Sequence, residues 1–378
     1  MSVLIFIRTF AGDFKEANMP YHSNNIYTLF DEVLEYYNAL LEDFKGASKG
    51  ICIELFRFGS GYIAKRIIAE LVRAAKRGVD VKVLVDDWGT PNAKALFAEL
   101  TEAGGAVQVW EKIRFSLKQR SLVKTHKRNH RKIITIDSQI AYVGSANITD
   151  YNLPWRESIL RVFDSEFTKT MKRIFLQYYN AARKGVEKKR ATKTLYVNEF
   201  EILRDVPSIL RSSVRKRYIE LIENATESIT IETPYFLPSH ILRKPIEAAL
   251  NRGVKVNIIL PFHSDVPLVD ILRRRYLGYF HEKGANILQY THNNLHAKVV
   301  FVDDTIFSIG SSNFDYRSFR FQHEIIVIGK HPEVVALLKN HIDGTLNDCV
   351  PFDYESWKRR SRIDIFSEWL LLPFRHLF

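Results

Sequence analysis

Two sets of residues in this chain repeat the same amino-acid types at the same spacing. In each set, four residues separate a lysine from an aspartate, and six separate that aspartate from a glycine. In chain order, the sets contain His130, Lys132, Asp137, Gly144, Ser145 and Asn147, and then His296, Lys298, Asp303, Gly310, Ser311 and Asn313. Two copies that agree at every position are not a chance match, so these residues are the first candidates for a functional site.

These residue types suit chemistry at a phosphate group. Histidine, with a free pKa of about 6.5, acts as a nucleophile or proton carrier near neutral pH, and lysine is a cation with three donors. Phosphoryl transfer depends mostly on positioning and on stabilising spread negative charge. The pattern predicts such chemistry with no metal and no cofactor. The neutral donors expected to bind phosphate are Ser145, Asn147, Ser311 and Asn313.

The residues between the motif positions predict the elements that hold them. Residues 133–136 and 299–302 are apolar and mostly β-branched, which is typical of strands, where residues i and i+2 share a face. Each histidine and its lysine then point the same way. Residues 140–143 and 305–309 are expected to be return strands that bring the serines and asparagines back beside the histidines. Each copy is therefore predicted to be a hairpin.

Two aspartates, Asp137 and Asp303, are counted with the catalytic residues of the repeat. An aspartate that follows an apolar strand is often a turn former, because its side chain hydrogen-bonds the nearby backbone. We therefore expect a supporting or structural contribution from both.

The duplicated motif resembles the signature of the phospholipase D superfamily, and the resemblance covers roughly residues 50 to 378. Longer stretches resemble bacterial cardiolipin synthases in particular. These stretches are Asn129-His130-Arg131-Lys132, residues 232–238 (Glu-Thr-Pro-Tyr-Phe-Leu-Pro), Leu295-His296-Ala297-Lys298 and residues 312–319 (Ser-Asn-Phe-Asp-Tyr-Arg-Ser-Phe).

The resemblance implies a division of labour between the two histidines. One imidazole attacks phosphorus to give a phosphohistidine, while the other protonates the leaving alcohol and then deprotonates the incoming one. By analogy, His130 is expected to be the nucleophile and His296 the general acid and base, with the reverse assignment left open. Glu157 and Glu324 match the acids that orient these histidines in the family.

One stretch departs from the family pattern. Where the synthases usually have Asn-Phe-Glu, this chain has Gln322-His323-Glu324. The acid stays in place, but a histidine replaces an aromatic residue beside the second motif. We expect both His126 and His323 to be peripheral.

The duplication extends beyond the motif. Residues 51–54 (Ile-Cys-Ile-Glu) match residues 229–232 (Ile-Thr-Ile-Glu), and Arg-Gly-Val follows a helical pattern both at 77–79 and at 252–254. We predict an α/β fold of two similar α-β-α sandwich halves, phospholipase D-like, related by a pseudo-twofold axis with one active site at their interface. The predicted halves are residues 1–190 and 191–378, with the boundary inside 184–200.

The charge of the chain implies an anionic partner. Lys and Arg exceed Asp and Glu by 12, and nine of the 21 residues from Lys112 to Lys132 are basic. That run suits a nucleic-acid backbone or an anionic bilayer. The C-terminal residues 357–378 mix basic side chains with Trp, Phe and Leu, which favours a lipid interface. We expect an anionic phospholipid, phosphatidylglycerol, as partner; nucleic acid is the alternative, and the oligomeric state is left open.

The chain contains no run of about 20 apolar residues that would span a bilayer. Its first ten residues are too short for a span and have neither a basic start nor a clear cleavage site. Cys52 and Cys349 form neither a disulfide framework nor a metal set. Peripheral association with the cytoplasmic face of the cell membrane is expected.

The resemblance and the charge together predict a phosphatidyltransferase. Two phosphatidylglycerol molecules would give cardiolipin and glycerol through a phosphohistidine intermediate. Attack by water would instead make the protein a phospholipase D-type hydrolase, and a polynucleotide substrate would make it a metal-independent phosphodiesterase or nuclease. A catalytically silent membrane-binding scaffold is a third possibility.

Overall fold

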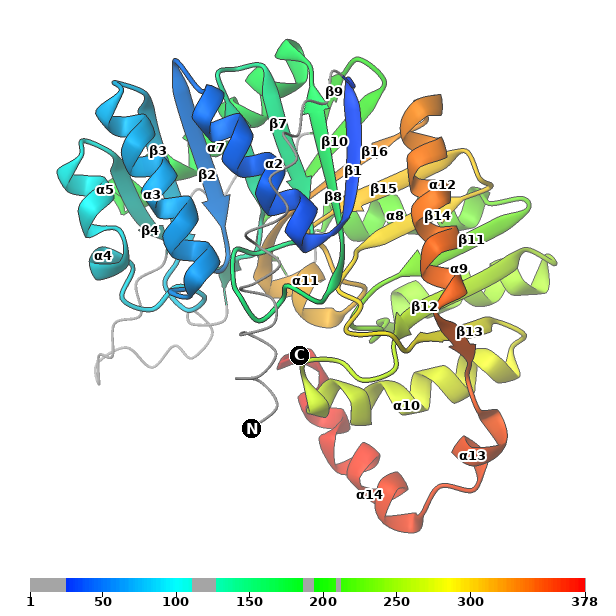
Figure 1. Cartoon of the computed structure of the whole chain (residues 1–378). Helices are drawn as coiled ribbons and strands as arrows, with labels where there is room; N and C mark the ends of the chain where they lie inside the picture. Colours follow the sequence, from blue (N-terminus) through cyan, green and yellow to red (C-terminus); the bar gives the residue numbers. More distant parts are fainter. Residues whose placement is uncertain (1–24, 111–126, 186–193, 209–211, 378) are drawn as a thin grey trace.

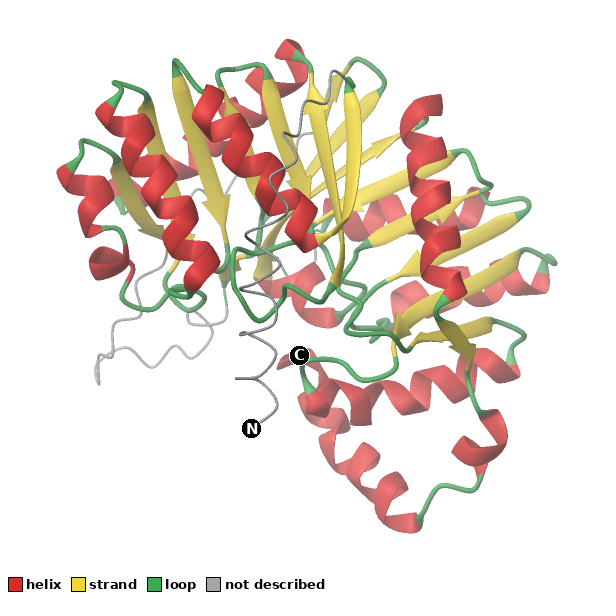
Figure 2. Ribbon diagram, in the orientation of Figure 1, coloured by secondary structure: helices red, strands yellow, loops and turns green. Residues whose placement is uncertain are grey.

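The protein contains two mixed β-sheets that stand side by side, with helices on their outer faces and between them (Figures 1 and 2). This computed structural model describes residues 25–110, 127–185, 194–208 and 212–377. The two sheets are built from the two halves of the duplicated sequence, so the predicted α/β architecture is confirmed.

The first sheet has seven strands, of which the neighbours β2, β3 and β4 run parallel and the others antiparallel. In spatial order the strands are β1 (Tyr27–Glu32), β8 (Arg156–Phe163), β7 (Ile140–Gly144), β6 (Ile133–Ile136), β2 (Gly50–Leu55), β3 (Asp80–Asp86) and β4 (Ala106–Trp110). The hairpin predicted for the first motif copy is the pair β6 and β7.

The second sheet repeats this plan, and β14 and β15 form its motif hairpin. Its spatial order is β17 (Cys349–Pro351), β13 (Asn286–Tyr290), β12 (Lys255–Pro261), β11 (Ser228–Glu232), β14 (Val299–Val302), β15 (Ile306–Gly310), β16 (Gln322–Gly329), β10 (Phe200–Asp205) and β9 (Leu195–Val197). A two-residue strand of the first half, β5 (Arg128–Asn129), pairs with β16. The two halves are therefore joined by main-chain hydrogen bonds next to the first motif histidine.

The helices form three groups around the sheets. On the first sheet lie α2 (Val33–Gly46), α3 (Tyr62–Lys76), α4 (Ala93–Leu96) and α5 (Ala98–Glu102); in the central core lie α7 (Ser165–Lys184) and α12 (Pro332–Asn347); against the second sheet lie α8 (Ser213–Asn224), α9 (His240–Asn251) and α10 (Pro267–Glu282). The remaining helices are α11 (Tyr316–Phe321), α13 (Tyr354–Lys358), α14 (Arg362–Leu371) and η1 (Leu372–Leu377). Figure 1 shows α13 and α14 beyond α10, away from both sheets.

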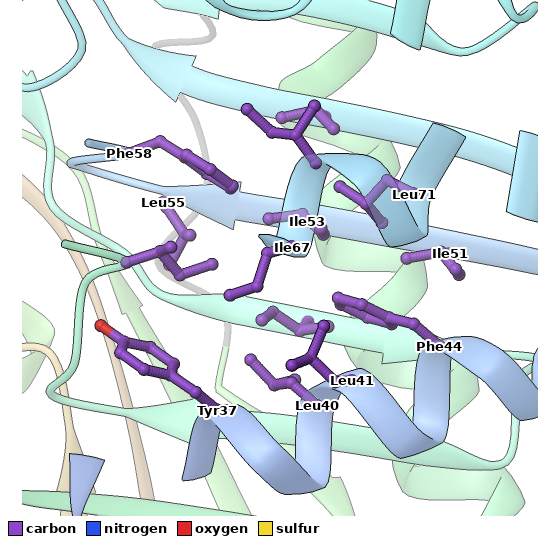
Figure 3. Close-up of a cluster of buried hydrophobic side chains, with 14 of the residues drawn as sticks. Tyr37, Leu40, Leu41, Phe44, Ile51, Ile53, Leu55, Phe58, Ile67 and Leu71 are labelled. Atoms are coloured by element: carbon purple, nitrogen blue, oxygen red, sulfur yellow. The ribbon is translucent and has the colours of Figure 1, made fainter. Parts of the chain in front are cut away.

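The core of the first half shows why its sequence forms these elements. Ile51, Ile53 and Leu55 alternate along β2 and so reach the same face of the sheet, where Ile67 and Leu71 of α3 pack against them (Figure 3). All five side chains are buried. Apolar residues at every second position of β2, and four positions apart in α3, thus predict the packing that holds the carboxyl end of β2 in place.

A central core joins the halves. Phe167, Met171 and Phe175 of α7 lie in the same buried cluster as Leu338 and Ile342 of α12, together with residues of both sheets. The last strand of the first sheet ends at residue 163 and the first strand of the second begins at residue 195. The boundary at residue 190 stays a prediction, and residues 186–193 lie outside the part of the chain that the structure describes.

Candidate active site

Both motif histidines lie where the two halves meet. The His130 backbone N–H donates to the carbonyl oxygen of His323 in the second half (3.0 Å), and the His296 N–H donates to the carbonyl oxygen of Arg156 in the first (2.8 Å). Each histidine is therefore fixed at the main chain by the opposite half. The repeated sequence has built one junction rather than two separate sites.

The side chains cross the junction in the same way. Nδ1 of His130 lies 3.1 Å from a carboxylate oxygen of Glu324, and Nδ1 of His296 lies 2.9 Å from both oxygens of Glu157. Both glutamates are fully buried. A carboxylate at Nδ1 fixes the ring orientation and leaves Nε2 for chemistry. Each half thus supplies the acid that orients the histidine of the other.

A cavity of about 300 Å³ brings these histidines together. His130 and His296 both line it, and so do Asn147 and Asn313, one from each motif copy. The other lining residues are Phe56, Arg57, Trp88, Tyr151, Trp155, Tyr235, Asp265, Val266, Val269, Asp315, Arg317 and Gln322. Two imidazoles, three carboxamides and two guanidinium groups around one small cavity suit an anionic group held between two histidines.

The motif lysines are buried directly behind the histidines. Lys132 Nζ donates to the carbonyl oxygen of His130 (2.8 Å), and Lys298 Nζ donates to that of His296 (2.6 Å). Burial, with repulsion from Lys298, lowers the pKa of Lys132 to about 7. Burial lowers the pKa of Lys298 to about 8, although Glu157 opposes the shift. An anion in the cavity would favour the charged form of both lysines.

The two histidine–glutamate pairs differ in their electrostatics. Burial and the nearby Lys132 and Lys298 hold the pKa of His130 well below its ordinary value, and burial raises the pKa of Glu324 to about 8. Burial also lowers the pKa of His296, but attraction to Glu157 opposes this. Burial raises the pKa of Glu157, but interactions with His296, Lys298 and Ser145 together outweigh that effect and leave the pKa below its ordinary value. The neutral forms of His130 and Glu324 are therefore favoured, whereas Glu157 keeps its negative charge beside His296.

Comparison with protein families matches residues 40–179 and 218–346 to the family described as cardiolipin synthase, PLD-like domain. These two segments make up well over half of the chain and contain both motif copies. The chain belongs to this phospholipase D-like cardiolipin synthase family. It is an enzyme of the phospholipase D superfamily, as its motifs predicted.

Relatives in this family match across most of the chain. The cardiolipin synthase of Oceanobacillus iheyensis is 32% identical over 352 residues, which is 90% of this chain and 73% of that protein. The major cardiolipin synthase ClsA of Bacillus subtilis is 30% identical over 344 residues, 86% of this chain and 69% of that protein. The crystal structure of a phosphatidylserine synthase from Haemophilus influenzae has the same fold, with a TM-score of 0.74 at 14% identity, covering 98% of this chain and 100% of that chain.

Within this cardiolipin synthase-like site, the motif serines do not have the place that we expected. Neither Ser145 nor Ser311 is among the described residues that line the cavity. The Ser311 hydroxyl donates to Glu324, and the hydrogen bond from Ser145 helps to lower the pKa of Glu157. The expected phosphate contact is corrected for the serines, because both lie behind the cavity and hold the glutamates, whereas the asparagines reach it.

The glycine before each motif serine lets that serine lie close to the strand that carries the glutamate. A Cβ on Gly144 would lie 2.2 Å from the carbonyl oxygen of Ser158, and one on Gly310 would lie 2.3 Å from that of Ile325. Only glycine permits such a close approach of neighbouring strands. Each glycine thus lets the motif hairpin pack tightly against the strand that carries the glutamate.

Asp137 and Asp303, which we counted with the catalytic residues, lie at the far ends of the motif strands. Asp137 accepts hydrogen bonds from the backbone N–H groups of residues 48–50, and Asp303 accepts them from those of residues 226–228. Both adopt a positive φ of 51°. They close the turns of the motif hairpins and lock them to β2 and β11, which corrects their inclusion in the catalytic set and fits the expected structural contribution.

The structure also shows where His323 and part of the basic run lie. The imidazole of His323 is buried against Trp110 and Tyr178, so it packs as an aromatic side chain would. Of the basic run, residues 112–126, including His126, lie outside the described part of the chain. Within the described part of the run, Arg128 and Arg131 are buried rather than exposed. Arg128 pairs there with Asp86, and Arg131 pairs with Glu54.

Sequence reasoning missed several residues of the cavity. Tyr235 and Arg317 lie inside the stretches that carry the family resemblance, which was the available signal. Trp88 and Asp265 follow β3 and β12, at the carboxyl ends of parallel strands where α/β proteins commonly bind ligands. The Tyr235 hydroxyl donates to Asp265 (2.6 Å), so these two form one polar wall of the cavity.

Proposed function

We propose that this protein transfers the phosphatidyl group of one phosphatidylglycerol to a hydroxyl of a second, forming cardiolipin and releasing glycerol. The observation that carries the proposal is the pair of buried histidines, each oriented by a glutamate of the other half, in one cavity. The names of the matched relatives support the choice of product. A transferase of this kind needs one nucleophile and one proton carrier, and the site offers one of each.

In the first step, Nε2 of His130 attacks the donor phosphorus. A phosphorus–nitrogen bond forms, and the phosphorus–oxygen bond to the glycerol headgroup breaks. The low pKa of His130 supports this assignment, because only an unprotonated ring nitrogen can attack. Nδ1 stays on Glu324, which keeps the ring aligned.

His296 carries the proton in both steps. Its protonated form gives a proton to the departing glycerol oxygen, and its neutral form then takes one from the hydroxyl of the second phosphatidylglycerol. That hydroxyl attacks phosphorus, the phosphorus–nitrogen bond breaks, and His130 is restored. The Glu157 carboxylate favours the charged state of His296 that the first step requires.

Cationic and amide groups stabilise the negative charge that spreads over the phosphate oxygens. Arg57, Arg317, Asn147 and Asn313 line the cavity. The buried ammonium groups of the motif lysines add positive charge from behind the histidines. Charge stabilisation by fixed donors in a site with little water is commonly the largest single contribution to such catalysis.

Contact with an anionic bilayer is proposed through α14. Its residues Ile363, Phe366 and Trp369 are 80%, 59% and 65% exposed. The exposed Arg359 and Arg362 stand beside them, and each basic residue near an anionic surface contributes about 1 kcal/mol. Among the described residues, no helix is long and apolar enough to cross a membrane. Binding is proposed to be peripheral, and the cytoplasmic face stays a prediction from the sequence.

Vesicle flotation tests this contact. The double variant Ile363→Ser with Trp369→Ser should float less with phosphatidylglycerol vesicles than the unaltered protein. Equal flotation of the two would contradict a docking contribution of α14.

The function is tested with purified protein and phosphatidylglycerol vesicles, with and without chelator, followed by mass spectrometry of the lipids. Cardiolipin and glycerol in equal amounts are expected, and both His130→Ala and His296→Ala should abolish them. Phosphatidic acid as the sole product would identify a hydrolase. Cleavage of an oligonucleotide included in the mixture, without lipid turnover, would identify a nuclease.

A further inference from the structure

A large apolar groove lies beside the catalytic cavity in the first half of the protein. Its volume is about 1030 Å³, which is at the upper end of the range of about 300–1,000 Å³ for ligand sites. It is formed by the loop between β2 and α3, by residues 88–96 with α4, and by the loop between β7 and β8. Phe58, Leu96, Leu153 and Pro154 give it an apolar lining.

The groove and the catalytic cavity lie next to each other and share lining residues. Arg57, Trp88 and Tyr151 line both. The Arg57 guanidinium donates to the Tyr151 hydroxyl (3.1 Å), so these side chains form a shared wall. Trp88 and Tyr151 are 44% and 48% exposed, which is unusual for such large side chains in a folded core. A molecule whose phosphate lies between the histidines would reach the groove past this wall.

The charges in the groove also favour a lipid. Among its described lining residues, only Arg57 and Asp150 are charged. The Asp150 carboxylate already accepts hydrogen bonds from the backbone N–H groups of Tyr62 (2.5 Å) and Ile63 (3.0 Å) at the start of α3. The only cation therefore stands at the cavity end, next to the expected phosphate, and the remainder is suited to hydrocarbon.

We propose that this groove holds the acyl chains of the donor phospholipid. The inference rests on the proposed function, because in that reaction the diacylglycerol part stays bound to His130 through phosphorus after the headgroup leaves. Exposing its chains to water would cost about 0.8 kcal/mol per CH₂ group. An apolar groove next to the cavity keeps them covered for the lifetime of the intermediate.

In the second half, a smaller pocket of about 400 Å³ at the start of α9 takes the matching place, and its lining includes His240, Arg320 and Arg375. The helices of the two halves also differ. In the second half, β12 is followed by α10, a helix of 16 residues. In the first half, the matching strand β3 is followed by two short helices, α4 and α5. Phe236 corresponds in the repeat to Phe58 of the groove, and both side chains are buried. The difference between the halves therefore lies in the volume and lining of the two pockets and in the helices that follow β3 and β12. The asymmetry assigns the donor chains to the first half, which also carries His130.

The test fills the groove by substitution. Ala95 lines the groove and is exposed, so Ala95→Trp should narrow it without disturbing the fold. The matched control is Ala98→Trp, an exposed position of α5 that is not among the groove residues. With Ala95→Trp, kcat/KM for dioleoyl phosphatidylglycerol should fall at least tenfold, and that for dihexanoyl phosphatidylglycerol less than twofold. If kcat/KM changes by the same factor for both chain lengths, or for neither, the proposal is overturned.

A second measurement does not require turnover. Phosphatidylglycerol with a photoreactive group at the end of one acyl chain is crosslinked to the unaltered protein, and the modified peptides are identified. Adducts within residues 57–61, 88–96 or 149–154 support the groove, even if no cardiolipin forms and the proposed function fails. Adducts confined to α14 or elsewhere overturn it, even if cardiolipin is made.

Discussion

At the scale of single residues, the crossed pairing of histidine and glutamate is the feature that defines this site. Glu324 holds His130 and Glu157 holds His296, each across the junction of the halves. The spacing of the repeat pointed to the two histidines, and the family resemblance pointed to the two glutamates. The sequence could not predict which glutamate serves which histidine, because the pairing depends on how two sheets far apart in the chain pack together.

The first prediction concerns the unequal glutamates. Glu324 is expected to be largely protonated at neutral pH because burial raises its pKa to about 8, whereas Glu157 keeps its charge beside His296. Glu157→Gln should therefore lower kcat by about 10- to 100-fold, the usual loss for a residue that orients a functional group. Glu324→Gln should cost clearly less, since amide and neutral acid are similar. Steady-state rates of cardiolipin formation decide this, and equal losses would contradict the proposed asymmetry.

At the scale of elements, the motif is a hairpin fastened at both ends. Asp137 and Asp303 lock the turn end to the neighbouring strands β2 and β11, and Gly144 and Gly310 allow close packing at the end that meets the glutamates. The alternation of apolar residues was enough to predict these hairpins. The turn-forming tendency of aspartate indicated the structural function of Asp137 and Asp303. The function of the serines could not be read from spacing, since a polar residue near a phosphate site has the same sequence signal whether it faces the ligand or supports its neighbour.

The second prediction tests the close packing at Gly144. In Gly144→Ala, the new Cβ would meet the carbonyl oxygen of Ser158 at 2.2 Å and push β7 from β8. A loss of about 1–3 kcal/mol in the free energy of unfolding is expected, as for other overpacked sites, together with lower activity. The control is Gly46→Ala, where a Cβ would meet nothing within 4 Å. Urea unfolding compares the two, and equal stabilities would show that the contact imposes no constraint.

At the scale of the whole molecule, a buried ionic cluster ties the halves together behind the site. Arg156 of β8 pairs with Asp31 (2.7 Å) and donates to Thr345 of α12 (2.7 Å). His341 of α12 lies 2.9 Å from Glu232 of β11. Arg156 also accepts the backbone hydrogen bond of His296, so this cluster positions the second motif.

The third prediction follows from the charge of His341. Burial would lower its pKa, but Glu232 and Asp31 outweigh this and raise the pKa to about 9. Because the pKa is higher in the folded state than the ordinary 6.5, its stabilisation is fully present below about pH 6.5 and is lost as the pH rises through about 9. The loss amounts to about 3 kcal/mol.

Unfolding free energies at pH 6 and pH 9.5 measure this effect. His341→Gln should reduce the difference between the two pH values, whereas His376→Gln, at an exposed position of η1, should not. The prediction is wrong if the pH dependence of His341→Gln equals that of the unaltered protein.

The duplicated sequence also predicted much of the whole-molecule architecture. Matching segments such as residues 51–54 and 229–232 became the matching central strands β2 and β11. The place of the proposed acyl groove was not among the features that the sequence predicted. The two halves diverge after β3 and β12, and only three-dimensional packing reveals that difference.

The central claim is that His130 carries the phosphatidyl group while His296 moves protons. It is tested most directly with His296→Ala and a phosphatidyl ester of p-nitrophenol, whose leaving group needs no proton. The variant should release about one p-nitrophenol per protein and then stop, because no base activates the acceptor. Peptide mass spectrometry should find the phosphatidyl adduct on His130. An adduct on any other residue, or its formation in His130→Ala, would contradict the account.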